Sequence, residues 1–158
     1  MTARMQTLTV RPSVGEDPMW AASLMSSSDP WITLGRGFDA CLRACTSRLD
    51  VLEIAEIGGE RCGFVLVRPA GIAGAPYISS IAVSPARRSH GVGAALLTHV
   101  ESTYAGRSRH LFLCVSSFNP RARAFYERHG FEAVGTFKDF LVEGADEILM
   151  YKRLTPPG

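Results

Sequence analysis

Two arginines and two glycines near the middle of the chain form a pattern suited to binding an anion. Residues 87–94 read Arg-Arg-Ser-His-Gly-Val-Gly-Ala and lie between an expected strand and an expected helix. The first amides of a helix have no partner inside the helix and carry a partial positive charge. Gly91 and Gly93 would let an anion approach the backbone, and the arginines add charge. The pattern therefore predicts a cradle of the kind suited to a pyrophosphate.

The same residues have a purely structural interpretation. Glycines at the start of a helix often serve packing, and neighbouring arginines are often simply solvated. The segment lacks the three-glycine spacing of a dinucleotide-binding turn. It also lacks the Lys-Ser/Thr pair that follows the glycines of a P-loop. Taken alone, residues 87–94 leave both interpretations open.

A second pattern, at residues 119–131, predicts a short helix with a tyrosine on its inner face. Asn119 suits the cap, Pro120 suits the first helical position, and Gly130 suits the left-handed residue that closes the helix. Its inner face is expected to carry Ala122, Phe125, Tyr126 and His129. Tyr126 is then either a core aromatic residue or a phenol presented to a site.

The elements that would hold these two patterns alternate along the chain. Apolar patterns predict strands at residues 8–11, 51–57, 62–68, 77–83, 111–116, 131–142 and 147–154. Two helices separated by a loop are expected within residues 16–48, and further helices at 91–104 and 119–130. Residues 58–59 read as a hairpin turn and residues 69–76 as a loop, while 77–83 is expected at the centre of the sheet. The order predicts a mixed α/β fold with a largely antiparallel N-terminal half.

Composition limits the classes of function. The 158 residues suit one domain, residues 1–158, and 46% are hydrophobic while 20% are charged. A net charge of +2 argues against nucleic-acid and membrane partners, and the start of the chain lacks a signal peptide, so we expect a cytoplasmic location. The four cysteines lack paired metal-ligand spacing, so we expect reduced thiols and no metal. The chain is compatible with a monomer or a homodimer.

Together, the two patterns resemble the GNAT superfamily of acetyltransferases. Residues 88–93 match its pattern Arg/Gln-x-x-Gly-x-Gly/Ala, and residues 119–131 match Asn-x-x-Ala-x-x-x-Tyr-x-x-x-Gly-Phe. Residues 81–85, Ile-Ala-Val-Ser-Pro, look like that family's fourth strand and its exit. The resemblance covers roughly residues 51–154 and implies a mostly antiparallel central sheet with helices on both faces.

The resemblance implies acetyl-CoA as co-substrate. The strands at 77–83 and 111–116 would splay apart, and the pantetheine arm would pair with the backbone near Ile81 and Val83, where an N–H would polarise the thioester carbonyl. The pyrophosphate would lie on amides 89–94, with Arg88, Arg121 or Arg123 near the 3′-phosphate. The expected coenzyme contacts are Ile81, Ala82, Val83, Arg88, Ser89, His90, Gly91, Val92, Gly93, Ala94, Asn119 and Ala122.

By the same resemblance, Tyr126 is the expected catalytic residue, near the sulfur of the thioester. A phenol with a pKa of about 10 is a weaker acid than a thiol of about 8.5, so full proton transfer is not downhill in water. A hydrogen bond from the phenol to the departing thiolate is the expected contribution.

No general base is evident in the sequence. The final segment is similar to the tail of the ribosomal-protein alanine N-acetyltransferases, which carry a glutamate base on the strand before the Asn-containing helix. Cys114 stands at that position here, where a buried inert thiol is expected. The alternatives are proton loss to water or one of four side chains, namely Glu53, Glu56, Asp139 and His110.

The acceptor pocket is expected to involve Trp31, Ser79, Ser80 and Phe140. Trp31 is equally a core anchor, and the two serines equally suit a β-bulge. The resemblance implies transfer of an acetyl group to a primary amine, on a small molecule or a peptide N-terminus, by direct attack in a ternary complex. The alternative is a coenzyme-A-binding sensor or interaction module with little turnover.

Overall fold

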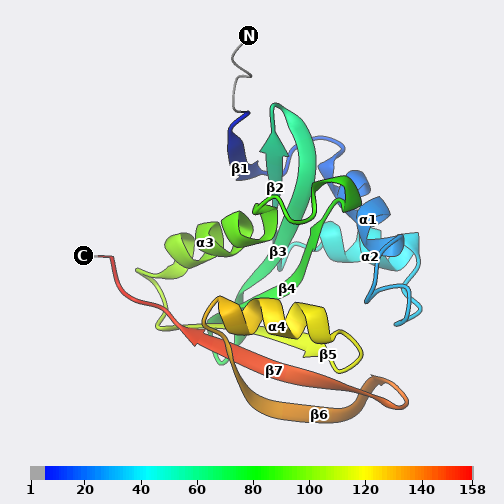
Figure 1. The fold of residues 1–158 in the computed structure, drawn as a ribbon, viewed down its shortest axis with the longest axis vertical. Coiled ribbons are helices and arrows are strands. Elements are labelled where there is room, and N and C mark those ends of the chain that lie inside the picture. The colour runs from blue at the N-terminus through cyan, green and yellow to red at the C-terminus, as the bar shows by residue number, and fades with distance from the viewer. Residues whose placement is uncertain (1–5, 158) are drawn as a thin grey trace.

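A computed structural model describes residues 6–157 and shows one seven-stranded sheet with helices on both faces (Figure 1). The strands lie in the order β1-β2-β3-β4-β5-β7-β6. Their bounds are β1 Leu8–Pro12, β2 Val51–Ile57, β3 Glu60–Ile72, β4 Ala75–Val83, β5 His110–Ser116, β6 Glu132–Val142 and β7 Ala145–Arg153. The helices are α1 Asp17–Ser26, α2 Phe38–Cys45, the 3₁₀ turn η1 Pro85–Arg87, α3 Val92–Tyr104 and α4 Pro120–Arg128.

The core is divided between the two faces of the sheet. Strand β3 shows this division, because Val65 and Val67 pack with α3 and α4 while Phe64 and Leu66 pack with α1 and α2. Successive side chains of a strand point to opposite faces, so a continuous apolar run indicates burial on both. The mixed fold expected from the sequence, with a central strand at 77–83, is confirmed.

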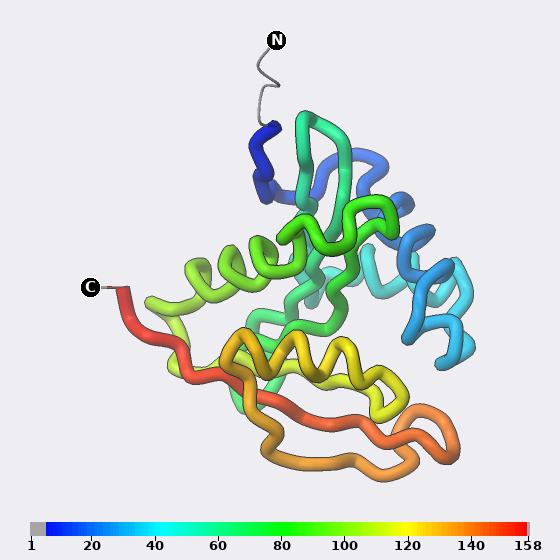
Figure 2. The backbone as a smooth tube through the Cα atoms, viewed as in Figure 1, coloured from blue at the N-terminus to red at the C-terminus, as the bar shows by residue number. Residues whose placement is uncertain are grey.

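Strands β4 and β5 form the one parallel pair of the sheet, and they stay together only at one end. Tyr77 pairs with Phe112 and Ile78 with Leu113, and no later pair joins the two strands. Both strands continue, to Val83 and Ser116 respectively, and they diverge in the backbone trace (Figure 2). The expected opening between these strands is therefore present.

The loop expected at residues 69–76 is wrong. Strand β3 runs on to Ile72, β4 begins at Ala75, and these two residues pair across a turn with positive φ at Ala73 and Gly74. The register shifts between Arg68 and Ile72, which absorbs the breaking residues without ending the hairpin. Beyond Val67 the strand has no β2 partner, so Pro69 loses no ladder bond on that side.

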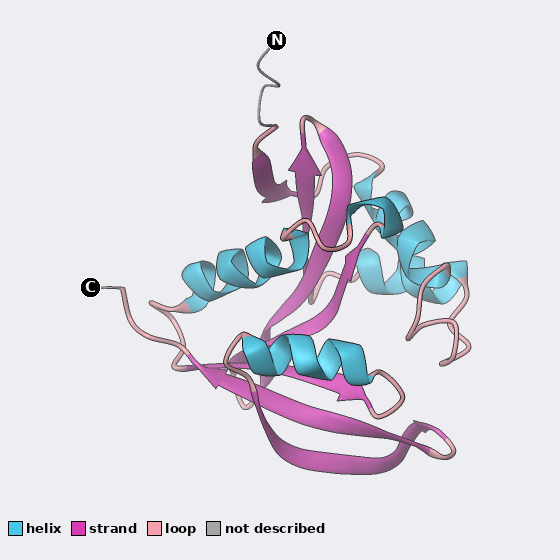
Figure 3. Ribbon diagram, in the orientation of Figure 1, coloured by secondary structure: helices cyan, strands magenta, loops and turns pink. Residues whose placement is uncertain are grey.

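Local signals fix the helices that border the opening. Gly91 and Gly130 adopt left-handed φ values of 78° and 89°, before α3 and after α4. The Asn119 side chain caps α4 by accepting a hydrogen bond from the Ala122 amide at 3.3 Å. A long loop joins α1 and α2, which lie on the face of the sheet opposite α3 and α4 (Figure 3).

A buried ion-pair cluster fixes the start of α1 to the sheet. Asp17 is 1% exposed and accepts hydrogen bonds from Arg11 Nη1 at 2.6 Å and Arg61 Nε at 2.7 Å. Arg11 also bonds Glu56. The Arg11 hydrogen bond, opposed by burial, lowers the pKa of Asp17 from 3.8 to about 2.

We expect Asp17→Asn to lower the free energy of unfolding by about 1–2 kcal/mol at pH 7. The loss is modest because both arginines are one-third exposed, and solvent screens their attraction to the carboxylate. Because the folded-state pKa is depressed, this stability is present above about pH 4 and is lost as the pH falls towards 2. Urea denaturation should therefore show the gap between wild type and variant narrowing across that window. Glu132→Gln, which removes an exposed charge, is the control; a constant gap would contradict the assignment.

Candidate active site

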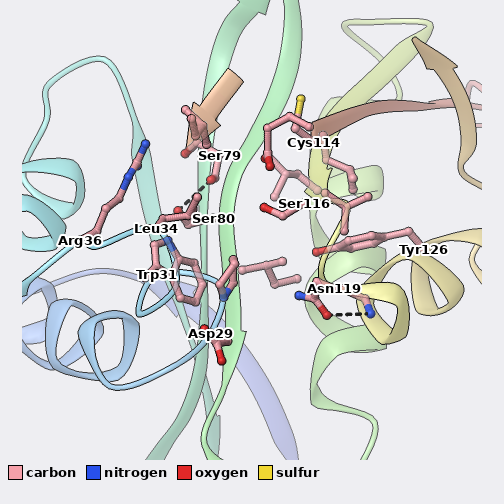
Figure 4. Close-up of a pocket in the computed structure, with 18 of the residues that line it drawn as sticks. Asp29, Trp31, Leu34, Arg36, Ser79, Ser80, Cys114, Ser116, Asn119 and Tyr126 are labelled. Atoms are coloured by element: carbon pink, nitrogen blue, oxygen red, sulfur yellow. Dashed lines mark hydrogen bonds between the residues drawn. The ribbon is translucent and has the colours of Figure 1, made fainter. Parts of the chain in front are cut away.

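A pocket of about 320 Å³ lies where β4 and β5 diverge. Figure 4 shows Trp31, Leu34 and Arg36 on one side of it and Cys114, Ser116, Asn119 and Tyr126 on the other. Its remaining lining comes from the α1–α2 loop, β4, β5, α4 and the β6–β7 hairpin, and comprises Asp29, Pro30, Tyr77, Ile78, Ser79, Ser80, Ile81, Leu113, Val115, Ala122, Phe140, Leu141 and Glu147.

The backbone that leads into α3 presents a row of free amides. Within residues 6–157, none of the N–H groups of residues 89–94 donates a hydrogen bond, and the first bonded amide is that of Ala95, which reaches Gly91 O at 3.0 Å. Positive φ at Ser89 and Gly91 forms the turn, and a Cβ at Gly91 would meet only open space. Free amides at a helix N-terminus, with room beside them, suit an anion.

Gly93 lies where α3 packs against α4. A Cβ at this position would lie 3.0 Å from Cζ of Phe125, so the glycine permits close packing of α3 against α4. Gly93 therefore serves the packing role that the sequence left open, and its amide remains free. Gly91 alone leaves the open space that an anion needs.

The arginines around this turn differ in their surroundings. Arg87 approaches Glu60 at 3.6 Å, and Arg123 pairs with Glu127 at 2.8 Å. Arg88 and Arg121 are exposed and form no ion pair within the described residues. Arg88, directly before the free amides, is therefore available to an anion there.

Strand β4 directs two amides into the opening. The Ser84 amide donates to Cys62 O of β3 at 2.8 Å. Successive backbone amides of a strand point to opposite edges, so the N–H of Ala82 also faces β3, whereas those of Ile81 and Val83 face away from it. Ile81 and Val83, the two residues expected to pair with pantetheine, thus offer backbone groups to the opening. The amide of Ala82, which was expected only as a coenzyme contact, faces β3 instead.

Tyr126 combines the two roles that its sequence left open. Its side chain is 8% exposed and packs edge-on against Phe125 and Phe131 in the core, yet it also lines the pocket. Burial raises its pKa well above the usual range, so the phenol keeps its proton. Its hydroxyl has no hydrogen-bond partner in residues 6–157 and is free to donate to a ligand.

The residues expected on the acceptor side do line the pocket. Trp31 is buried and packs in the α1–α2 core, and it also lines the pocket. Ser79 is the extra residue of a bulge, because the register passes from Leu66–Ser80 to Val67–Ile78, and its hydroxyl donates to Leu66 O at 3.1 Å. Ser80 and the exposed Phe140 also line the pocket.

The four side chains considered as bases lie outside the pocket. Glu53 bonds His99 at 2.6 Å, Glu56 bonds Arg11 at 2.8 Å, and Asp139 accepts from the Gly144 amide at 2.7 Å. His110 packs on the rings of Phe112 and Tyr151. None of the four is in the lining, so these candidates are not supported.

Cys114 does line the pocket, as a neutral thiol. Burial raises its pKa, and a smaller lowering effect of Tyr77 does not reverse that. All four cysteines are free, and Cys114 is the least buried of them. The thiol therefore has no thiolate character with which to act as a base or nucleophile.

Glu147 is a buried carboxylate of the pocket that sequence reasoning missed. It lies opposite Ser116 in the β5–β7 ladder, is 6% exposed, and has one oxygen, Oε2, that is buried without a hydrogen-bond partner in the described residues. A glutamate that opens an apolar strand segment was the only signal in the sequence. Its position depends on the β5–β7 pairing, which local patterns do not reveal.

Residues 19–131 match the profile of the acetyltransferase (GNAT) family. The 5-NmdU N-acetyltransferase of Pseudomonas phage PaMx11 is 36% identical over 84 residues, which are 53% of this chain and 59% of that protein. The ribosomal-protein-S18-alanine N-acetyltransferase of Escherichia coli superposes with a TM-score of 0.74 at 20% identity, covering 96% of this chain and 97% of the other. An aminoglycoside 6′-N-acetyltransferase complexed with coenzyme A gives 0.75 at 16% identity, covering 95% and 99%.

The chain spans about three fifths of the length of the curated relatives it matches. Among the described residues, no helix has the length and apolar character required to cross a membrane. The profile match extends from α1 to the end of α4 and includes both the free amides before α3 and the capped helix that carries Tyr126. The chain belongs to the GNAT acetyltransferase family, whose members use acetyl-CoA.

Proposed function

We propose that this protein transfers an acetyl group from acetyl-CoA to a primary amine, by direct attack in a ternary complex. The observation that carries the proposal is the run of free amides at residues 89–94, beside the opening between β4 and β5. An anionic head group and an extended arm are the two parts of coenzyme A that such a site would hold. The acceptor is a small molecule or a peptide N-terminus.

The residues present fit coenzyme A as co-substrate. Amides 89–94 would donate hydrogen bonds to the pyrophosphate oxygens, and the exposed Arg88 would add charge beside them. The amides of Ile81 and Val83 would pair with pantetheine in the manner of an added strand. Ala122 and Asn119 line the same opening, where the Asn119 amide group remains available beyond its capping bond.

The chemistry proposed for the site is acyl transfer. The neutral amine nitrogen attacks the thioester carbonyl carbon, the carbon–nitrogen bond forms, and the carbon–sulfur bond breaks. Negative charge passes from the carbonyl oxygen to the departing sulfur. The Tyr126 phenol is protonated and has no partner in the described part of the chain, so it would donate a hydrogen bond to that sulfur.

The acceptors named for related proteins differ widely. The compared enzymes are named for 5-NmdU, for an alanine of a ribosomal protein and for an aminoglycoside. A shared fold does not fix the acceptor, since the site is built partly by loops. In this chain, the α1–α2 loop and the β6–β7 hairpin form the acceptor side, and they are what a choice among amines would depend on.

Saturating coenzyme A is expected to raise the melting temperature by about 5–10 °C at a hundredfold excess over Kd, because the ligand binds only the folded state. Release of free thiol from acetyl-CoA in the presence of amines then tests turnover. A thermal shift without thiol release would favour a coenzyme-A-binding module. Absence of a shift at saturation would contradict both functions.

A further inference from the structure

One oxygen of the Glu147 carboxylate is buried without a partner. The side chain is 6% exposed, and no donor in residues 6–157 reaches Oε2. Leaving a buried polar group unpaired is costly, and for a charged group the cost is higher still. A carboxylate kept in this state calls for a donor that comes from outside the chain.

The β5–β7 ladder places Glu147 on the wall of the pocket. Glu147 lies opposite Ser116 in the ladder, and residues directly opposite one another project from the same face of the sheet. Residues two positions apart along a strand also share a face, so Cys114 projects from that face too. Figure 4 shows Cys114 and Ser116 bordering the same cavity as Tyr126. Glu147 therefore faces the space in which an acceptor would meet the thioester.

Glu147 has one competitor as a cation-binding group in the pocket lining. Asp29 also carries a carboxylate, but its Oδ1 accepts from the Thr33 amide at 3.1 Å and from the Thr33 hydroxyl at 2.7 Å, in an exposed setting. Glu147 is the buried carboxylate of the two, and it has an oxygen free. A donor that enters the pocket would meet Glu147 with less competition from water.

We propose that Glu147 forms the ammonium subsite of the acceptor and takes the amine's proton, and that the acceptor carries an apolar or aromatic group next to its primary amine. This inference rests on the proposed acetyl transfer. Trp31, Leu34, Phe140 and Leu141 line the acceptor side of the pocket, which supplies the apolar wall. An ammonium group gives up to three N–H donors, one of which would satisfy Oε2.

With Glu147 as the proton acceptor, every proton of the transfer is accounted for. An incoming ammonium group gives one proton to Glu147 and becomes the neutral nucleophile. After attack on the carbonyl carbon, the nitrogen loses a second proton as the amide forms, and the departing sulfur gains one. The products are the acetylamide, coenzyme A as free thiol, and one proton that passes from Glu147 to solvent.

The groups facing Glu147 do not compete with it for this proton. Burial is the main cause that raises the pKa values of Tyr77 of β4, Cys114 of β5 and Tyr126 of α4. These groups therefore stay protonated and cannot take up the amine's proton. The charged side chains in the lining are Arg36 and Asp29 of the α1–α2 loop. The β6 residues of the lining, Phe140 and Leu141, carry no charge.

Glu147→Gln keeps the shape of the side chain and removes its charge. We expect it to lower kcat/KM about a hundredfold for phenethylamine at pH 7.5. The loss should be smaller for phenylalaninamide, because an α-amino group with a pKa near ~8 is partly neutral there, whereas an alkylamine near ~10.4 is almost fully protonated. Glu143→Gln removes an exposed charge from the neighbouring turn and is the control. A merely structural loss would affect both amines equally.

Binding provides a second readout. With coenzyme A present, phenethylamine should raise the melting temperature of the wild type and of Glu143→Gln, but not of Glu147→Gln. Glu147→Asp, which keeps the charge, should retain part of this response. If Glu147→Gln matches the wild type in binding and rate, or if neither amine binds the wild type, the inference is wrong. Glu147-dependent binding without thiol release would support the subsite and contradict acetyl transfer.

Discussion

A Gly91→Asp variant is expected to bind coenzyme A about a hundredfold more weakly than a Gly91→Asn variant. Both side chains have nearly the same size, and both tolerate the left-handed φ of 78° better than other residues do. A Cβ at this position meets only open space, so neither substitution disturbs the packing. The two proteins then differ in one negative charge beside the free amides. At an effective dielectric constant near 20, such a charge a few ångströms from a pyrophosphate costs on the order of 3 kcal/mol.

Calorimetric titration with coenzyme A at several salt concentrations measures this difference. The ratio of the two dissociation constants should fall as salt rises, because the charges are exposed to screening. Melting temperatures of the two apo proteins should agree closely, which separates the electrostatic effect from backbone strain. Equal affinities of the two variants would mean that the pyrophosphate does not lie at residues 89–94.

The features that the sequence predicts well are those set by short-range chemistry. Gly91, Asn119 and Gly130 mark the helix ends because a left-handed φ or a side-chain cap depends only on neighbouring residues. The loop predicted after Arg68 was wrong because the effect of a breaking residue there depends on distant parts of the chain. Pro69 ends a strand only where its missing N–H is needed, and here β2 has already ended. That circumstance lies outside the local sequence.

The acceptor side of the site shows where prediction from sequence fails. Glu53 and Glu56 are held by His99 and Arg11, each more than forty positions away in the chain. Glu147 reaches the pocket because β7 pairs with β5, and this pairing crosses the whole of α4 and β6. Long-range strand pairing therefore decides which carboxylate faces the pocket, and residue spacing alone does not contain that information.

Tyr126→Phe is expected to lower kcat for acetyl transfer about a hundredfold or more, while the affinity for coenzyme A stays within about twofold. The lost interaction is a hydrogen bond to charge that develops only during the reaction, and removing one such donor has effects of this size. Folding should not suffer, because the hydroxyl has no partner among residues 6–157 and the ring keeps its contacts with Phe125 and Phe131. A fall in kcat with unchanged KM and melting temperature would distinguish this role from that of a core aromatic residue.

Tyr104→Phe is the matched control for this experiment. Tyr104 is also buried in the same core and also has a pKa raised by burial, but it is not part of the pocket lining. Its substitution should leave thiol release unchanged. The pH dependence adds an independent test. Ionisation would abolish the donor, and burial raises the pKa of Tyr126 well above its usual value near ~10, so the ratio of wild-type to Tyr126→Phe rates should stay constant between pH 8 and pH 10. A ratio that declines across that range would show that the phenol ionises in the working enzyme and does not act as the proposed hydrogen-bond donor.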